Sequence, residues 1–355
     1  MTKTILEISQ ITQLLAPRSL AASWDQEGWE LFFPDAPCQG ILLSLDLDRL
    51  AFQHAMANKI NLIITHHPSI FSPISDLQGG EASGRLQIDC LQAGISQISL
   101  HTSWDRAPGG VSDSLAQALN QAFLAKKLRA SIRPQDKVQA LIASLEDPRV
   151  QKELSLPFLM TPKLLATLQE DLPYLRLIDL EAPLSPDELG ASLGILTREI
   201  LQGPTSRTIL QGALQNNYVG QPLLGRCTQA KILNQAFTPS FLVFPGAAPA
   251  GMVPLLDCLQ ILLAPEGRQV VGVLTGELKH NLIVDLELRD VLSLPLGHRL
   301  TEAYSLTALG QKLEHKIKEG GKDDITSLPP IYLSTDEGCA RLGCYQPSQN
   351  EGRFN

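Results

Sequence analysis

Short apolar runs alternate with helix-length segments in the first third of the chain, and this alternation constrains the fold more than any other feature. Three apolar runs have the length and composition of buried strands: residues 40–47, 60–65 and 95–102. Three other segments have the spacing of helices: residues 48–59, 81–94 and 111–123. Gly94 is expected to cap the second helix, and Ser112 or Asp113 the third. Such alternation predicts βαβ units on a mostly parallel sheet.

The middle of the chain, residues 128–184, breaks this rhythm with two predicted helices flanked by short strands. The alternation returns from Gly190 and continues to a last predicted strand at 331–335. We therefore expect an α/β fold with two βαβ-type halves, mostly parallel or mixed sheets, and a small α+β insertion between the halves. The expected domains are residues 1–127, 128–184 and 185–355.

Composition narrows the class of protein. The net charge of −8 repels phosphate backbones, which argues against nucleic acid as the main partner. Apolar residues recur at helical spacing in residues 1–17, which predicts an amphipathic helix rather than a signal peptide. Prolines interrupt the apolar segment 240–256, so no membrane span is expected. The scattered cysteines are typical of reduced thiols in a cytoplasmic protein, and Cys339 and Cys344 are spaced too widely for a usual zinc pair.

Most of the seven histidines lie just beyond a predicted strand. His66 and His67 follow the strand at 60–65, and His101 follows or ends the strand at 95–102. His280 and His298 follow two later strands, and most of these histidines have a carboxylate within four residues. Sites in open α/β sheets form at the carboxyl ends of strands, so these positions indicate a functional site.

The spacing of these residues indicates metal ligands. His298 and Glu302 share one face if a helix has begun, and His101 and Asp105 are placed similarly or on one tight loop. Adjacent His66 and His67 are expected to diverge and so to face two different ions. Imidazole with carboxylate suits Zn²⁺, Fe²⁺ or Mn²⁺. Each motif alone is more often structural or solvated. Four such segments in order, at residues 66–67, 101–105, 275–280 and 297–302, favour a metal site.

The chain resembles the dinuclear-metal-centre hexameric protein family, whose members are often labelled GTP cyclohydrolase 1 type 2 homologues. The matching segments are LIITHHPSIF, HTSWDRAPGGVSDSLAQAL, TGELKH and GHRLTE, with weaker matches at SWDQEGW and LSLDL. The resemblance implies two divalent metal ions in a cleft between the halves and a toroidal homohexamer. It implies five metal ligands: His66, His67, Asp105, His298 and Glu302. Glu302 is the natural bridging candidate because a carboxylate has two oxygens to share.

Further residues match family positions close to the metals. His101 and Glu277 are expected to orient ligands or to transfer protons in catalysis, and His280 and Asp46 to act behind the ligands. Asn281 stands where relatives usually carry a second His or Asp, and WDQEG replaces the usual WDNxG. These differences from the family pattern are expected to affect the substrate and the activity more than metal binding. The insertion faintly resembles a degenerate PII-like domain.

The segment APGGVSD contains two glycines before a predicted helix. Gly109 and Gly110 would expose backbone N–H groups that can bind an anion such as phosphate. The competing interpretation is a plain turn with an N-cap.

Two classes of function remain open. The first is a metal-dependent hydrolase, resembling a GTP cyclohydrolase, that acts on a nucleotide-like or phosphorylated small molecule through metal-activated water. The second is a non-catalytic hexameric scaffold or regulator that holds metal and binds a small effector. A site that merely clamps the two halves, and DNA binding inside a toroid, are further alternatives, the latter disfavoured by the acidic balance.

Overall fold

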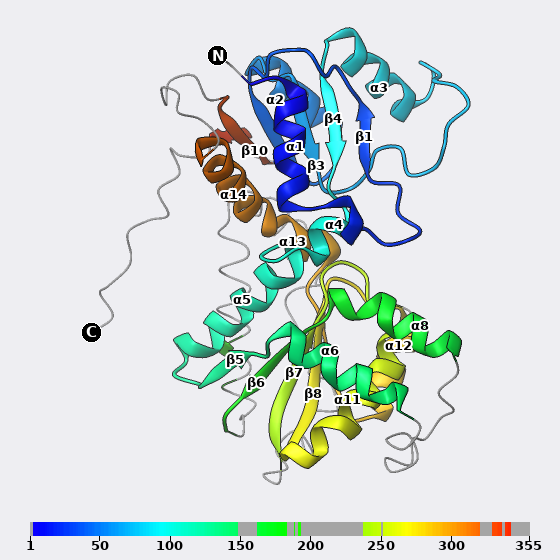
Figure 1. The fold of residues 1–355 in the computed structure, drawn as a ribbon, viewed down its shortest axis with the longest axis vertical. Coiled ribbons are helices and arrows are strands. Elements are labelled where there is room, and N and C mark those ends of the chain that lie inside the picture. Colours follow the sequence, from blue (N-terminus) through cyan, green and yellow to red (C-terminus); the bar gives the residue numbers. More distant parts are fainter. Residues whose placement is uncertain are drawn as a thin grey trace. The chain divides into compact units, whose positions relative to one another are not determined.

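The computed structural model describes residues 3–147, 162–182, 188, 191–192, 237–249, 251–319, 329–335 and 338–341. These residues form two compact units, shown in Figure 1. The first unit contains residues 3–107, 305–319, 329–335 and 338–341, and the second contains the other described residues. The predicted domain ranges 1–127, 128–184 and 185–355 stay a prediction. The part of the returning alternation that is expected within residues 193–236 lies outside the described residues.

The first unit contains a six-stranded sheet in the order β1-β4-β3-β2-β10-β11. Its strands are β1 (Gly28–Leu31), β2 (Ile41–Ser44), β3 (Leu62–Thr65), β4 (Ser96–Ser99), β10 (Ile331–Thr335) and β11 (Gly338–Arg341). The four central strands run parallel, and the two edge strands pair antiparallel. Every residue of β2, β3 and β4 is buried, as expected for parallel strands covered on both faces.

Helices accompany this sheet, and those expected within residues 1–17, 48–59 and 81–94 are present. They are α1 (Ile5–Leu15), α2 (Arg49–Ala57), α3 (Ala82–Gln92), α4 (Thr102–Arg106) and α14 (Ser305–Glu319), with the short η1 (Arg18–Leu20). One core cluster joins Leu42 and Ile63 of the strands to Ala51 and Ala55 of α2 and to Cys90 of α3. Cys38, Cys90 and Cys258 are buried free thiols.

The second unit contains a five-stranded sheet in the order β5-β6-β7-β8-β9. Its strands are β5 (Ala130–Ile132), β6 (Arg176–Leu180), β7 (Thr238–Val243), β8 (Arg268–Thr275) and β9 (Leu292–Pro295). Its helices are α5 (Val111–Ala125), α6 (Gln135–Ala143), α8 (Pro162–Asp171), α11 (Met252–Leu263), α12 (His280–Leu288) and α13 (His298–Ala303), with the short η2 (Ser144–Glu146), η3 (Leu172–Tyr174) and η5 (Ala264–Glu266).

Successive residues of β7 pack into two different hydrophobic cores. Phe241 and Val243 of β7 pack with α5, whereas Leu242 between them joins the cluster built on α6, α8 and α11. Phe241 meets Phe123 of α5 with ring centroids 5.3 Å apart. The strands β7, β8 and β9 are parallel, so their carboxyl ends lie at one edge of the sheet.

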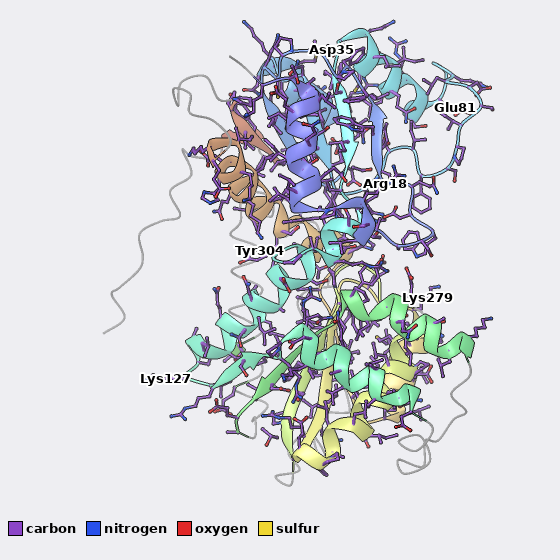
Figure 2. The ribbon with its side chains drawn as sticks, in the orientation of Figure 1. Arg18, Asp35, Glu81, Lys127, Lys279 and Tyr304 are labelled. Carbon is purple, nitrogen blue, oxygen red and sulfur yellow. The ribbon has the colours of Figure 1, made fainter. Side chains whose placement is uncertain are left out.

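The predicted α/β class with mixed sheets is confirmed, but the cap assigned to the third helix was wrong. Gly110, rather than Ser112 or Asp113, is the N-cap of α5, because the helix already includes Val111. Gly94 follows the C-cap Ala93 with a φ of 66°, the left-handed conformation that ends many helices. Lys127, labelled in Figure 2, ends α5 in the same way with a φ of 61°. Among the helices the structure describes, none is long and apolar enough to cross a bilayer.

Helix α1 begins with a capping box. The Thr4 hydroxyl accepts the N–H of Glu7 at 3.2 Å, and the Glu7 carboxylate accepts the Thr4 N–H at 2.7 Å. We expect Thr4→Ala to lower the free energy of unfolding by about 1 kcal/mol, because it leaves one helical N–H without its acceptor. Thr4→Ser keeps the hydroxyl and is the matched control in urea unfolding. Equal stability of the two variants would contradict this assignment.

Candidate metal centre

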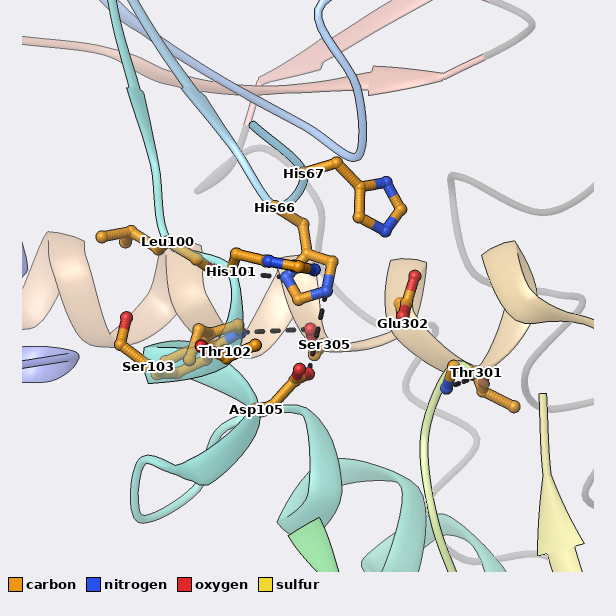
Figure 3. A network of polar contacts seen from close by, with 12 residues as sticks. His66, His67, Leu100, His101, Thr102, Ser103, Asp105, Thr301, Glu302 and Ser305 are labelled. Carbon is orange, nitrogen blue, oxygen red and sulfur yellow. Dashed lines mark hydrogen bonds and ion pairs between the residues drawn. The ribbon is translucent and has the colours of Figure 1, made fainter. Parts of the chain in front are cut away.

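The first unit gathers polar side chains at one edge of its sheet. The parallel strands β2, β3 and β4 are neighbours, and Asp46, His66 and His101 follow their carboxyl ends. Figure 3 shows His66, His67 and His101 close together beyond these strands. The apolar runs of the sequence form the strands, and the histidines lie just beyond the points where these strands end.

The three imidazoles form one cluster. One ligand atom from each of His66, His67 and His101 lies within 4.8 Å of the others. The ring centroids of His66 and His67 are 4.8 Å apart, so the expectation that these neighbours diverge was wrong. The physical reason is that β3 ends at Thr65, and the alternation of side chains along a strand no longer applies beyond it.

Each imidazole of the cluster presents its Nδ1 to an acceptor. Nδ1 of His66 donates to the Leu100 carbonyl at 3.2 Å, that of His67 to Asp46 at 2.8 Å, and that of His101 to Asp25 at 3.0 Å. A neutral imidazole that donates from Nδ1 keeps its lone pair on Nε2. Imidazoles around transition-metal ions in proteins are usually held in this way, with Nδ1 hydrogen-bonded to an acceptor and Nε2 bound to the metal. Here carboxylates hold two of the three rings. The residues of the first unit therefore fit a divalent metal ion.

Asp105 lies beside this cluster on the short helix α4. His101 is the N-cap of α4, and the Asp105 N–H donates to the His101 carbonyl at 3.1 Å, so the two residues share one helical turn. The Asp105 carboxylate is buried, and its Oδ1 lies 3.7 Å from His66 Nε2. That distance exceeds a hydrogen bond but places a carboxylate among the imidazoles, as the sequence predicts.

Asp25 supports His101 and was missed by sequence analysis. Its carboxylate accepts His101 Nδ1 and also the N–H and hydroxyl of Thr102. Burial raises the pKa of Asp25, but the hydrogen bonds from His101 and Thr102 outweigh it and lower the pKa to about 2. A charged Asp25 therefore holds the His101 ring. The only sequence signal was the weak match at SWDQEGW, which contains Asp25.

In the second unit, His298 forms an ion pair on a helical face. His298 is the first residue of α13, and its Nε2 lies 2.9 Å from Glu302 Oε1, one turn further on. His298 Nδ1 contacts the Glu277 carboxylate, which follows the end of β8. The hydrogen bond to Glu302 raises the pKa of His298 to about 9, with a smaller contribution from Glu277 and against burial, which lowers it. Glu277 therefore stands behind His298 as Asp46 stands behind His67.

Two glycines and a threonine shape the surroundings of Glu302. Gly246 has a φ of +59°, and an added Cβ would lie 2.3 Å from Glu302 Oε1. Gly276 lies so close to the Gly246 carbonyl that its Cβ would meet that oxygen at 2.3 Å. Thr301 accepts the Gly246 N–H at 3.0 Å and donates to the His298 carbonyl at 2.9 Å. Sequence analysis missed Gly246 and Thr301, although Thr301 stands inside the GHRLTE segment.

The remaining predicted residues lie as follows. His280 is exposed at the start of α12, and its role behind the ligands stays a prediction. Gly110 caps α5, and the N–H of Gly109 donates to the Asp113 carboxylate at 2.5 Å. An internal carboxylate thus occupies the N–H that an anion would need, while the second oxygen of Asp113 accepts from Arg176. Anion binding by Gly109 and Gly110 stays a prediction.

Curated relatives match part of the chain. It is 32% identical over 113 residues to the GTP cyclohydrolase 1 type 2 homolog of Bacillus subtilis, covering 32% of this chain and 30% of that protein. It is 36% identical over 107 residues to NIF3-like protein 1 of Drosophila melanogaster, covering 30% of this chain and 36% of that protein. The chain thus spans about a third of the length of these relatives in the alignments.

Solved structures share the fold over nearly the whole chain. A Bacillus cereus protein related to NIF3 aligns over 100% of both chains with a TM-score of 0.60 and 15% identity. Reduced HcgD from Methanocaldococcus jannaschii aligns over 95% of this chain and 99% of its own, with a TM-score of 0.59 and 17% identity. A family model also matches more than half of the sequence, residues 3–200. The chain therefore belongs to the Duf34/NIF3 (NGG1p interacting factor 3) family.

Proposed function

We propose that this protein binds two divalent metal ions and hydrolyses a nucleotide-like or phosphorylated small molecule. The proposed ligands are His66, His67, Asp105, His298 and Glu302. The observation that carries the proposal is the shared hydrogen-bond pattern of three clustered imidazoles, in which an acceptor holds each Nδ1 and so directs the lone pair to Nε2, the atom that can bind a cation. The ions, when bound, would act as Lewis acids that polarise the substrate and make water a better nucleophile.

The chain's own residues would orient ligands and move a proton. Asp46, Asp25 and Glu277 each hold one imidazole Nδ1, which fixes the tautomer and direction of the ring. Glu277 is exposed and can exchange a proton with water, so it is the better placed of the two predicted proton carriers. His101, which belongs to the imidazole cluster, is the other. The toroidal homohexamer and a cytoplasmic location are part of the same proposal.

The test combines metal analysis with a substrate screen. Protein purified without chelators is expected to hold about two equivalents of Zn, Fe or Mn per chain, because the proposed donors suffice for two ions. GTP, other nucleoside triphosphates and p-nitrophenyl phosphate are then incubated with native and chelator-treated protein. Phosphate release and chromatography of the products would reveal hydrolysis, which is expected to need the metal. Native sedimentation gives the assembly state.

Two outcomes would change this conclusion. Two equivalents of metal without turnover of any of these compounds would favour the non-catalytic scaffold or regulator. Metal far below one equivalent, in protein that keeps its helical circular dichroism, would contradict the metal centre itself.

A further inference from the structure

Two half-exposed aromatic side chains flank His101. Trp24 is 52% exposed and Phe71 is 51% exposed, although large aromatic rings usually bury most of their surface. Their ring centroids lie 6.2 Å apart, at an interplanar angle of 47°. His101 meets Trp24 at 6.0 Å and Phe71 at 6.5 Å, edge to face in both cases. The first unit thus carries an aromatic pair directly beside its imidazole cluster.

Both rings stand on segments that carboxylates hold in place, Asp25 for Trp24 and Glu30 for Phe71. Trp24 precedes Asp25, whose carboxylate binds His101 and Thr102. Phe71 follows Ile70, whose N–H donates to Glu30 at 2.6 Å, and the Ser69 hydroxyl donates to the same oxygen at 2.6 Å. The rings are therefore presented by fixed backbone. A binding surface prepared in this way loses little conformational entropy when a ligand arrives.

The chemistry of the pair selects a flat, aromatic ligand. Neither ring carries a charge that would attract a phosphate, whereas a ring face attracts the electron-poor face of a heterocycle. Stacking of a base on an aromatic side chain depends little on which base it is, since every base has such a face. A ring bound here would lie next to His101 and so beside the proposed reaction site.

We propose that Trp24 and Phe71 form a binding surface for a planar heteroaromatic ring of the substrate, of the nucleobase type. This inference rests on the proposed function, because it assigns the substrate class at that site. It adds a contact that neither the metal ligands nor the residues behind them supply. The competing occupant of an exposed aromatic pair is a second copy of the chain.

The test measures ring binding by calorimetry with metal-loaded full-length protein. Guanosine, adenosine and cytidine are the probes, and ribose 5-phosphate is the control ligand without a ring. Trp24→Ala and Phe71→Ala are each expected to weaken nucleoside binding about tenfold or more, which is the usual contribution of one stacked ring. Phe32→Ala is the matched control: Phe32 is 37% exposed and stacks on Trp29 rather than on His101. It is expected to bind nucleosides like the native chain.

Metal content, measured in every preparation, separates this inference from the proposed function. Metal-loaded protein that binds none of the nucleosides, or binds them equally well in the two variants, overturns the aromatic surface and leaves the metal centre standing. Protein that is purified without bound metal, but whose nucleoside binding still depends on Trp24, overturns the metal centre and supports the aromatic surface. Loss of self-association in Trp24→Ala and Phe71→Ala, with nucleoside binding unchanged, would identify the pair as an interface between copies and also overturn it.

Discussion

Replacement of His66 by alanine is expected to lower bound metal from about two equivalents per chain to one or fewer. His66 is only 2% exposed, and its Nδ1 is held by the Leu100 carbonyl, so alanine removes a buried and oriented imidazole from the cluster. Loss of one imidazole from a small donor set removes most of the affinity of a metal ion for that site. Metal analysis after gel filtration measures the change directly.

The same measurement on Glu302→Gln tests the contribution of the second unit. Glutamine keeps the size of the side chain but removes the charge, so a loss of metal cannot come from an altered core. His315→Ala is the matched control, because the His315 side chain is 71% exposed and pairs with Glu319 on the surface of α14. We expect His315→Ala to keep its full metal content. Native metal content in both His66→Ala and Glu302→Gln would refute the proposed dinuclear centre.

Sequence patterns predicted the residues that lie at the strand ends. The run that becomes β3 is apolar and ends in His66, and the segment that becomes α13 carries His298 and Glu302 at helical spacing. Both signals are local, because strand burial and helical periodicity act between near neighbours. Parallel pairing of β3 with β4 then brings His101 to the same edge, as the βαβ pattern implies.

The supporting residues depend on contacts between distant parts of the chain. Asp25 binds His101 across 76 positions of sequence, and it precedes β1, a four-residue strand that no sequence pattern indicated. Strand β1 pairs antiparallel at the sheet edge and is only partly buried, so it lacks the apolar run that marks β3. Gly246 could not be identified from the sequence either, because its role depends on its closeness to Glu302 and not on the residues next to it in the sequence.

The structure also changed the interpretation of the histidine pair. Strand alternation predicted that His66 and His67 point apart, whereas the rings lie together with His101. Strand geometry does not apply to this pair, because His66 and His67 are the first two residues after Thr65, where β3 ends. The assignment of these imidazoles to particular ions therefore depends on the metal analysis and not on the divergence of the two side chains.

Gly246→Ala is expected to weaken metal binding at least tenfold while the fold persists. Gly246 has a φ of +59°, so alanine there costs roughly 1 kcal/mol or more of backbone strain. Its Cβ would lie 2.3 Å from Glu302 Oε1 and 3.3 Å from His298 Nε2. The carboxylate is the end of a flexible side chain, so it would move aside rather than unfold the unit. That movement displaces one proposed ligand and disturbs a second.

Gly267→Ala provides the comparison that isolates this displacement. Gly267 has a φ of +68°, close to that of Gly246, but an added Cβ there would meet no atom within 4 Å. Both variants should lose the stability that a strained left-handed backbone costs, and Gly246→Ala should lose more in urea unfolding because it also disturbs the ion pair between His298 and Glu302. Competition against a chromogenic chelator should then show weakened metal binding in Gly246→Ala alone. Equal metal affinity in the two variants would mean that Glu302, as placed by Gly246, is not a ligand.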